Sequence, residues 1–265
     1  AYAKGRAQFG KKIIIFPAVY DMLSRMKAKL DAGRSILYQT ARYVDIYKAL
    51  EDIARDRTLT PEERKEMKLY SRLADAFTPL AKGMNSEYAN QNAYDAISVH
   101  GGSGFIMEYK CQRLFRDARI FSIYEGTTQL QVVAAIRYVT NGTYLGIIKE
   151  MLEKEVAPEF QALKERVAKM VEKYEDAINY VKAAGNNDLH DFLARRLYEM
   201  TAEIIMSLLI LDDATRAPEL FAKSANVYVR YAEGTVAGHY AYIKEFKAED
   251  LADFLAATPE EAPAE

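Results

Sequence analysis

Apolar residues return every three or four positions along most of the chain, which is the spacing of amphipathic helices. From Pro17 to about Arg55 this pattern predicts one long helix with the proline in its first turn. A second helix begins at Thr60-Pro61-Glu62-Glu63, because these residues supply an N-cap threonine, a proline at the first helical position and a glutamate at the third. It is predicted to reach Val99, with a bend near Pro79, where the ring removes a backbone donor.

The glycine-rich sequence His100-Gly101-Gly102-Ser103-Gly104 ends that helix. Beyond it the pattern predicts a short helix over 112–116, a connector over 119–125, and a helix from Gly126 to about Thr140 that stops at Asn141-Gly142. Three longer helices follow, over 158–184, 188–214 and 219–246, and residues 186–188 cap the middle one. No stretch alternates between apolar and polar residues with β-branched enrichment, so no strand is predicted.

The predicted fold class is therefore all-α, with two helical bundles packed on each other. The boundary falls near Asn141–Leu145, where no Gly/Ser/Pro-rich linker separates the halves. This gives a first domain over 1–143, an up-and-down bundle over 144–258, and a tail over 259–265 that is expected to fray.

Composition excludes several classes of function. The 265 residues include 36 Lys+Arg and 38 Asp+Glu without a basic block, which disfavours nucleic acid as a partner. A single cysteine, Cys111, excludes a disulfide framework and a Cys-rich zinc site. The longest apolar run, Ile204–Leu211, is far short of the roughly 20 residues that span a bilayer, and Ala1–Arg6 lacks the apolar core of a signal peptide. A cytoplasmic protein is expected, and the absence of an initiator methionine suggests a piece of a longer chain.

Two segments lack helical regularity, Tyr2–Gly10 and Ser98–Gln129. The Gly101-Gly102-Ser103-Gly104 turn lets a backbone approach a ligand closely, although a sequence of this kind on its own more often forms only a tight turn between helices. Glu125 lies just before a helix, where a carboxylate on its own is usually a cap. The three histidines, His100, His190 and His239, lie far apart without acidic neighbours at ligand spacing, so no metal site is predicted.

The combination of motifs is more specific than any one of them. The sequences over 88–105, 116–120 and 123–131 resemble, in order and spacing, the C-terminal helical domain of the acyl-CoA dehydrogenases. Upstream, Arg6-Ala7-Gln8-Phe9-Gly10 resembles the Arg-x-x-Phe-Gly element of that family. This resemblance covers residues 1 to about 140, and the segment from about 145 to 260 is a weaker match to the additional helical domain of longer, bacterial-type members. It implies the C-terminal portion of an FAD-dependent flavoprotein.

The resemblance assigns chemistry to Tyr124-Glu125-Gly126 on the substrate side. Glu125 matches the base that removes the α-proton of an acyl-CoA thioester while the β-hydrogen leaves as hydride, giving the trans-2-enoyl-CoA. Such a base is expected in an apolar pocket that excludes water. The nitroalkane oxidases resemble this pattern but use Asp at the position of the base, so Glu125 disfavours them.

The resemblance also assigns contacts to FAD. Thr127 and Gln129 match flavin contacts at a helix N-terminus. Arg6, Gln8 and Phe9 match a stretch that contacts the FAD of the neighbouring subunit, with the guanidinium on the pyrophosphate. Ser98, Gly101 and Gly102 match contacts to the adenosine end. Ser98 stands where the family usually has Gln, which shortens or removes one of these contacts.

An electron-transfer flavoprotein is the electron acceptor that the resemblance implies. It also implies a homo-oligomer, with a dimer favoured over a tetramer because the additional bundle occupies surface that shorter members use for pairing. Two alternatives stay open: a non-catalytic helical oligomerisation module, and an acyl-CoA oxidase on the same scaffold. The resemblance implies that a complete member also has an N-terminal helical domain and a middle β domain against which the flavin rests. This sequence lacks both, so the chain alone is expected to be inactive.

Overall fold

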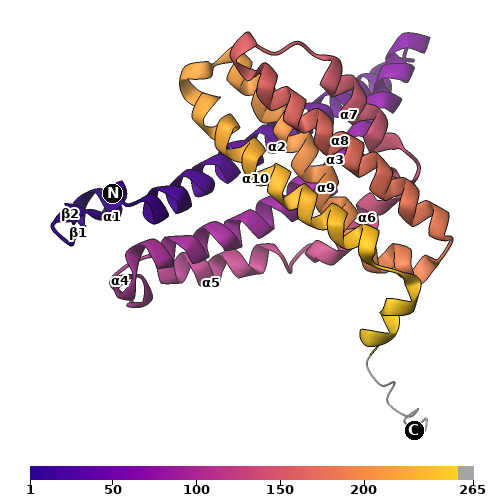
Figure 1. Ribbon diagram of the computed structural model, residues 1–265. Helices are drawn as coiled ribbons and strands as arrows, with labels where there is room; N and C mark the ends of the chain where they lie inside the picture. The colour runs from indigo at the N-terminus through magenta and orange to yellow at the C-terminus, as the bar shows by residue number, and fades with distance from the viewer. Residues whose placement is uncertain (256–265) are drawn as a thin grey trace, which may run out of the picture.

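The computed structural model describes residues 1–255 and is built almost entirely of helices (Figure 1), which confirms the predicted all-α class. The predicted tail over 259–265 lies outside the described residues. The helices are α1 (Tyr2–Gly5), α2 (Pro17–Asp56), α3 (Pro61–His100), α4 (Gly102–Phe105), α5 (Cys111–Phe121), α6 (Thr128–Thr140), α7 (Thr143–Glu153), α8 (Gln161–Ala184), α9 (Asn187–Arg216) and α10 (Pro218–Glu245). Short 3-10 turns span Ile13–Ile15, Pro158–Phe160 and Ala248–Asp253.

Two long helices, α2 and α3, pack along each other and extend as an arm from the main body (Figure 1). The predicted capping box is present at the start of α3, where Thr60 Oγ1 accepts from the Glu63 amide at 3.1 Å and the Glu63 carboxylate accepts from the Thr60 amide at 2.8 Å. The helix continues unbroken through Pro79. The free end of the arm carries α1 and α4, and α5 packs beside α3.

The prediction that the chain has no strands is wrong at one place. Strands β1 (Ala7–Gln8) and β2 (Lys11–Lys12) form a minimal antiparallel hairpin. Phe9 and Gly10 between them have φ of 48° and 74°, and positive φ at both central residues is what a two-residue hairpin turn requires. Strands of two residues are too short to produce an alternating pattern in the sequence.

The structure differs from the predicted helices at three further places. The short helix over 112–116 is longer, because α5 runs to Phe121 and absorbs part of the predicted connector. The next helix begins at Thr128 rather than Gly126, since Thr127 is its N-cap. Helix α7, at the predicted boundary between the two halves, was not predicted at all. It buries Tyr144 and Ile148 against the other helices, so this junction is part of the core rather than a linker.

One continuous apolar core joins the two halves. Helices α9 and α10 pack on α2, and α9 also packs on α6. The apolar run Ile204–Leu211 lies at the centre, with every residue buried. Across residues 1–255 no helix combines the length and the apolar character needed to cross a membrane. The halves therefore pack against each other, as the missing linker suggested.

A buried polar cluster crosses the same interface. The Glu203 carboxylate on α9 accepts from the Tyr88 hydroxyl of α3 at 2.6 Å and from the Tyr228 hydroxyl of α10 at 2.7 Å. Nearby, the buried Lys29 donates to Gln91 Oε1 at 2.6 Å, and its ammonium lies 4.5 Å from the centre of the Tyr231 ring. Burial disfavours the charged form of lysine and lowers the pKa of Lys29.

Candidate functional site

The segment between α5 and α6 holds Glu125 in an unusual conformation. Glu125 and Gly126 have φ of 50° and 90°, two consecutive residues in the left-handed region. Glycine adopts this region freely, but for a glutamate it costs roughly 1–2 kcal/mol. A side chain at position 126 would also meet Gln131 Nε2, which fills the space above the glycine. Thr127 ends the turn as the N-cap of α6, with Oγ1 accepting from the Leu130 amide at 3.2 Å.

Glu125 and Tyr124 line a pocket of about 440 Å³ between the α5–α6 turn and the arm. Most of its exposed lining is apolar, and the other residues that form it are Leu37, Thr40, Thr78, Ala81, Lys82, Asn85, Ser86 and Phe121. Glu125 itself is exposed at the mouth, and Tyr124 is 46% exposed. The predicted water-excluded surroundings of the base are therefore not formed by residues 1–255 alone.

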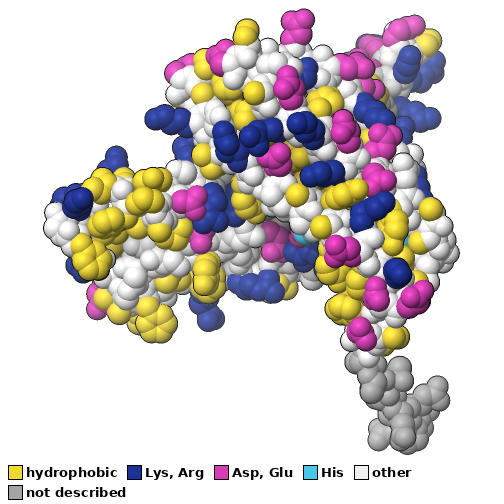
Figure 2. Space-filling view, in the orientation of Figure 1, with side chains coloured by type: hydrophobic (Ala, Val, Ile, Leu, Met, Phe, Trp, Pro, Cys, Tyr) yellow, Lys and Arg dark blue, Asp and Glu magenta, His cyan; other side chains and the backbone are white. Residues whose placement is uncertain are grey.

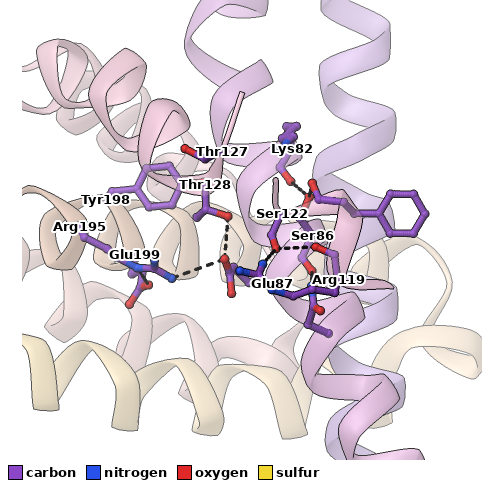
Figure 3. Close-up of polar contacts among 12 residues, drawn as sticks. Lys82, Ser86, Glu87, Arg119, Ser122, Thr127, Thr128, Arg195, Tyr198 and Glu199 are labelled. Carbon is purple, nitrogen blue, oxygen red and sulfur yellow. Dashed lines mark hydrogen bonds and ion pairs between the residues drawn. The ribbon is translucent and has the colours of Figure 1, made fainter. Parts of the chain in front are cut away.

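Three side chains on one face of α3 hold this turn in place (Figure 3). Lys82 Nζ donates to the Gly126 carbonyl at 2.5 Å, and Ser86 Oγ donates to the Phe121 carbonyl at 2.9 Å. Glu87 Oε1 accepts from Thr128 Oγ1 at 2.6 Å. The turn is thus tied to α3 at its beginning, middle and end. None of these three anchors was singled out from the sequence, where they are indistinguishable from other polar residues of a long helix.

An ion-pair chain continues from this anchor into the second half of the molecule (Figure 3). Arg195 on α9 lies 3.7 Å from Glu87 Oε1 and donates through Nε to Glu199 at 2.8 Å. His239 Nε2 of α10 lies 2.8 Å from the same carboxylate. Burial raises the pKa of Glu199, but the hydrogen bonds from His239 and Arg195 outweigh it and hold that pKa below its usual value.

Thr127 and Gln129 lie within one turn of Glu125, and both are exposed at the N-terminus of α6. The unpaired amides and the macrodipole of a helix make this end electropositive, which suits an anion or the electron-rich edge of a ring. The structure thus gathers Tyr124, Glu125, Gly126, Thr127 and Gln129 at one place.

The other predicted site residues gather in a second pocket, of about 570 Å³, at the free end of the arm. Arg6, Gln8, Phe9, Ser98, Gly101 and Gly102 all line it. Gly101 has φ of 60°, and open space lies where side chains at Gly101 and Gly102 would project, so a ligand can approach this backbone. Residues separated by more than 80 positions in the sequence therefore meet at one site.

Tyr2 and His100 also line this second pocket, although neither was predicted as a site residue. The Tyr2 ring stacks on His100 with 4.2 Å between ring centres, and its hydroxyl donates to the His100 carbonyl at 3.3 Å. Tyr2 begins the first irregular segment but was given no contact, and His100 was interpreted as an ordinary structural histidine. The stack fixes the N-terminal segment beside the glycine turn.

Within one chain the two pockets share no residue. The turn with Glu125 lies against the middle of α3, whereas the Arg6 pocket lies where the arm ends (Figure 1). Hydrophobic side chains gather over that end (Figure 2), and Phe9, Phe105 and Met107 are 92%, 82% and 87% exposed. An apolar surface of this kind marks an interface or a binding groove.

The remaining candidates contribute little to either pocket. Cys111 is buried, and its thiol donates to the Gly104 carbonyl at 3.3 Å. Two of the histidines each contact one carboxylate, since His190 lies 3.0 Å from Asp191 and His239 lies 2.8 Å from Glu199. Sequence separation hid the second of these contacts. In the part of the chain that the structure describes, no three His, Cys, Asp or Glu residues are grouped as metal ligands.

Comparison with known protein families gives two adjoining matches. Residues 1–139 match the family model described as "Acyl-CoA dehydrogenase, C-terminal domain", which spans more than half of the chain. Residues 140–251 match a second model, "Acyl-CoA dehydrogenase C terminal".

Curated relatives and solved structures agree with these matches. The chain is 36% identical over 130 residues to the caffeyl-CoA reductase-Etf complex subunit CarC of Acetobacterium woodii, covering 49% of this chain and 28% of that protein. It is 35% identical over 127 residues to the 3-methylmercaptopropionyl-CoA dehydrogenase of Ruegeria pomeroyi, covering 48% and 20%. The fold matches an acyl-CoA dehydrogenase complexed with FAD from Bacillus anthracis with a TM-score of 0.68 at 22% identity, covering 91% of this chain and 44% of that one. The chain thus spans less than half the length of these proteins.

Proposed function

The chain belongs to the acyl-CoA dehydrogenase family, and from this premise we propose that it is the C-terminal portion of an FAD-dependent enzyme that oxidises an acyl-CoA thioester to the trans-2-enoyl-CoA. The observation that carries the proposal is Glu125, held in a left-handed turn at the mouth of an apolar pocket. A carboxylate that lines an apolar pocket on a fixed backbone has the placement that a general base requires.

In this proposal the Glu125 carboxylate takes the α-proton of the thioester. Tyr124 and Phe121 contribute an apolar wall along which the acyl chain lies, and both are about half exposed in this chain and so available for contact. Thr127 and Gln129 flank the base at the electropositive end of α6. The remaining walls, which exclude water from Glu125, belong to parts of the enzyme outside this sequence.

The residues of the second pocket fit the phosphate and adenosine portion of FAD. Arg6 is exposed there, and a guanidinium pairs with a pyrophosphate in a bidentate manner. The open backbone at Gly101 and Gly102 leaves room for close approach, and Gln8, Phe9 and Ser98 complete the contacts. FAD, when bound, would supply the acceptor for the hydride that leaves the β-carbon.

Because the Arg6 pocket and the Glu125 turn are separate within one chain, we infer that each active site combines two subunits. Arg6, Gln8 and Phe9 then serve the FAD of the neighbouring subunit, and the enzyme is at least a homodimer. Because Glu125 and Tyr124 are exposed here and the surface that would enclose flavin and substrate belongs to the rest of the enzyme, the chain alone is expected not to turn over acyl-CoA. We keep the division into a flavin-side domain over 1–143 and an additional helical bundle over 144–258, and a cytoplasmic location, as parts of this proposal.

The names of the relatives cover both directions of this reaction. One relative is named as a reductase of an Etf complex and another as a dehydrogenase, and the same base and flavin serve either direction. We favour oxidation, with an electron-transfer flavoprotein accepting the electrons.

Anaerobic stopped-flow mixing of the full-length enzyme with saturated acyl-CoAs of short, medium and long chain tests the proposal. Loss of the oxidised flavin absorbance on mixing is expected with at least one of them. If none bleaches the flavin, while the reduced enzyme is reoxidised rapidly by an enoyl-CoA or arylacrylyl-CoA, the physiological reaction is reduction.

A further inference from the structure

The turn that carries Glu125 is held by an interaction that the proposed chemistry does not use. Lys82 lies one turn before Ser86 on α3 and reaches the Gly126 carbonyl with a hydrogen bond of 2.5 Å. Within residues 1–255 Lys82 forms no ion pair with a carboxylate, so this carbonyl is the group that its ammonium binds. A hydrogen bond from a charged donor is about twice as strong as a neutral one.

The turn needs such an anchor because its backbone is strained. Glu125 at φ 50° is one of two non-glycine residues with positive φ in the described chain, and the surrounding contacts must compensate for the cost. The Ser86 and Glu87 contacts fix the two ends of the turn, at Phe121 and Thr128. Among residues 1–255, only the side chains of Lys82 and, at 3.4 Å, Gln131 donate to the carbonyl of Gly126, the residue directly after Glu125.

Lys82 is also placed to act on chemistry rather than on folding alone. It is half-buried and lines the same pocket as Tyr124 and Glu125, so its ammonium lies at the wall of the proposed substrate site. Its removal leaves the buried core beneath α3 untouched, because the core contacts of this stretch are made by Leu80, Ala81 and Met84.

We propose that Lys82 is a positioning residue: its ammonium holds the Gly126 carbonyl and so fixes the backbone that presents Glu125 to the α-carbon of the substrate. This inference rests on the proposed function, in which Glu125 is the base. A misplacement of a reacting group by about 1 Å costs on the order of 10²-fold in rate, so loss of the anchor affects the chemical step before it affects binding.

The test uses Lys82→Met in the full-length enzyme, which keeps the apolar stem and removes the donor. Single-turnover flavin reduction by a saturating saturated acyl-CoA is expected to slow by roughly 10–10²-fold, with the half-saturating concentration and the flavin content little changed. Lys82→Arg keeps a charged donor and is expected to recover part of the rate. With an α,α-dideuterated substrate, Lys82→Met is expected to show a larger isotope effect than the wild type, because proton removal then limits the rate.

Lys164→Met is the matched control. Lys164 also donates to a backbone carbonyl, that of Lys154 at 2.7 Å, but it lies on α8 away from both pockets with predicted site residues. The inference is overturned if Lys82→Met reduces its flavin at the wild-type rate. It is also overturned if the lower rate is explained by lost flavin and lowered thermal stability. If Lys82→Met does not accumulate, Lys82→Gln, which is too short to reach Gly126, is measured in the same way.

Glu125→Gln, measured in parallel, separates the two proposals. If Glu125→Gln reduces its flavin slowly and Lys82→Met reduces it at the wild-type rate, only the role of Lys82 is wrong. If Glu125→Gln is as fast as the wild type, the proposed function itself fails.

Discussion

The hydroxyl of Tyr198 lies where a side chain at Gly83 would be. A Cβ built on Gly83 would overlap the hydroxyl oxygen, which instead enters the gap and donates to the Pro79 carbonyl at 2.9 Å. This contact joins α9 to α3 one turn after the proline and next to the residues that hold the Glu125 turn. The absence of a side chain at one position of α3 is thus what lets the second half of the chain pack against the site.

Gly83→Ala is therefore expected to destabilise the protein, although alanine is the better helix former. Overpacking of a closely packed contact costs about 1–3 kcal/mol, because the tyrosine must leave its hydrogen bond or the helices must separate. Gly234→Ala is the matched control: Gly234 is an exposed helical glycine of α10 with open space around it, and its substitution is expected to stabilise by about 0.5–1 kcal/mol. Urea unfolding of both variants measures the difference.

Tyr198→Phe tests why Gly83→Ala is expected to lose stability. On its own it removes a hydrogen bond and is expected to cost about 1 kcal/mol. Combined with Gly83→Ala it removes the overlapping oxygen, so the double variant is expected to be more stable than the sum of the two single effects predicts. Simple additivity would mean that the overlap at Gly83 does not cause the destabilisation.

The buried Glu203 gives the protein a pH-dependent stability. Burial raises the pKa of this carboxyl to about 7, and the hydrogen bonds from Tyr88 and Tyr228 only partly oppose the shift. Since the folded state binds the proton more tightly than the unfolded state, the stabilisation is present below about pH 4.5 and is lost as the pH rises through about 7. The shift corresponds to about 3 kcal/mol of unfolding free energy over that range.

Glu203→Gln is expected to remove this dependence while keeping a polar group between the two tyrosines. Unfolding free energies at pH 5 and pH 7.5, compared between the wild type and the variant, isolate the carboxyl from other titrating groups. We expect the wild type to lose roughly 2–3 kcal/mol more than the variant between these pH values. Parallel pH profiles for the two proteins would show that Glu203 is ionised in both states.

The helices and their caps followed from the sequence because they depend on local pattern. The Thr60 capping box, the Asn186 cap and the left-handed Gly142 at the end of α6 all appear where they were predicted. Elements that depend on tertiary contacts could not be predicted from the sequence. Helix α7 was missed because its short apolar face only becomes decisive when Tyr144 packs into the core and donates to the Ala76 carbonyl.

The candidate site was predictable only through the motif. Spacing in the sequence brings Glu125, Thr127 and Gln129 together, and the structure places them at one helix start. Spacing in the sequence does not indicate that Arg6 and Gly101 line one pocket, or that Lys82 and Glu87 hold the turn. Those contacts result from how α3 packs against α1 and α6. The exclusion of water around Glu125 stays a prediction for the full-length enzyme, because Glu125 is exposed among residues 1–255.

The isolated chain is expected to bind FAD weakly and to show no turnover. It holds the Arg6 pocket and the proposed base, but the exposed Glu125 and the half-exposed Tyr124 lack the surface against which flavin and substrate would be enclosed. Gel filtration of residues 1–265 with added FAD, followed by the flavin absorbance of the protein peak, measures how much FAD stays bound to the chain. A stoichiometric yellow complex would contradict the expectation and place the whole flavin site within this chain.

Hybrid dimers test whether each active site combines two subunits. Arg6→Ala is expected to weaken FAD binding by about 10–10²-fold, the effect of losing a charged hydrogen bond, and Glu125→Gln to stop proton removal. Suppose that Arg6 serves the neighbour's FAD, and that a dimer contains one Arg6→Ala subunit and one Glu125→Gln subunit. The site with Glu125 of the first subunit then receives Arg6 from the second and is intact. The other site carries both substitutions. Co-expressed subunits carrying different affinity tags are therefore expected to recover about half of the wild-type activity. An inactive hybrid would mean that Arg6 and Glu125 serve the same site within one chain.

The sharpest prediction concerns Glu125 itself. Glutamine at this position keeps the shape of the side chain and its ability to accept a hydrogen bond, but it cannot take a proton, and the α-proton of a thioester is too weakly acidic to leave without a base within hydrogen-bond reach. In the full-length enzyme we expect Glu125→Gln to retain its flavin and its affinity for acyl-CoA while flavin reduction slows by at least about 10²–10⁴-fold.

Glu62→Gln is the control, because Glu62 lies in the first turn of α3 and is exposed, as a purely capping carboxylate would be. A capping role for Glu125 predicts a different pattern, a loss of about 1 kcal/mol of stability with the rate almost intact. Stopped-flow bleaching of the flavin by a saturated acyl-CoA distinguishes the two, and bleaching of Glu125→Gln at the rate of Glu62→Gln would rule out Glu125 as the base.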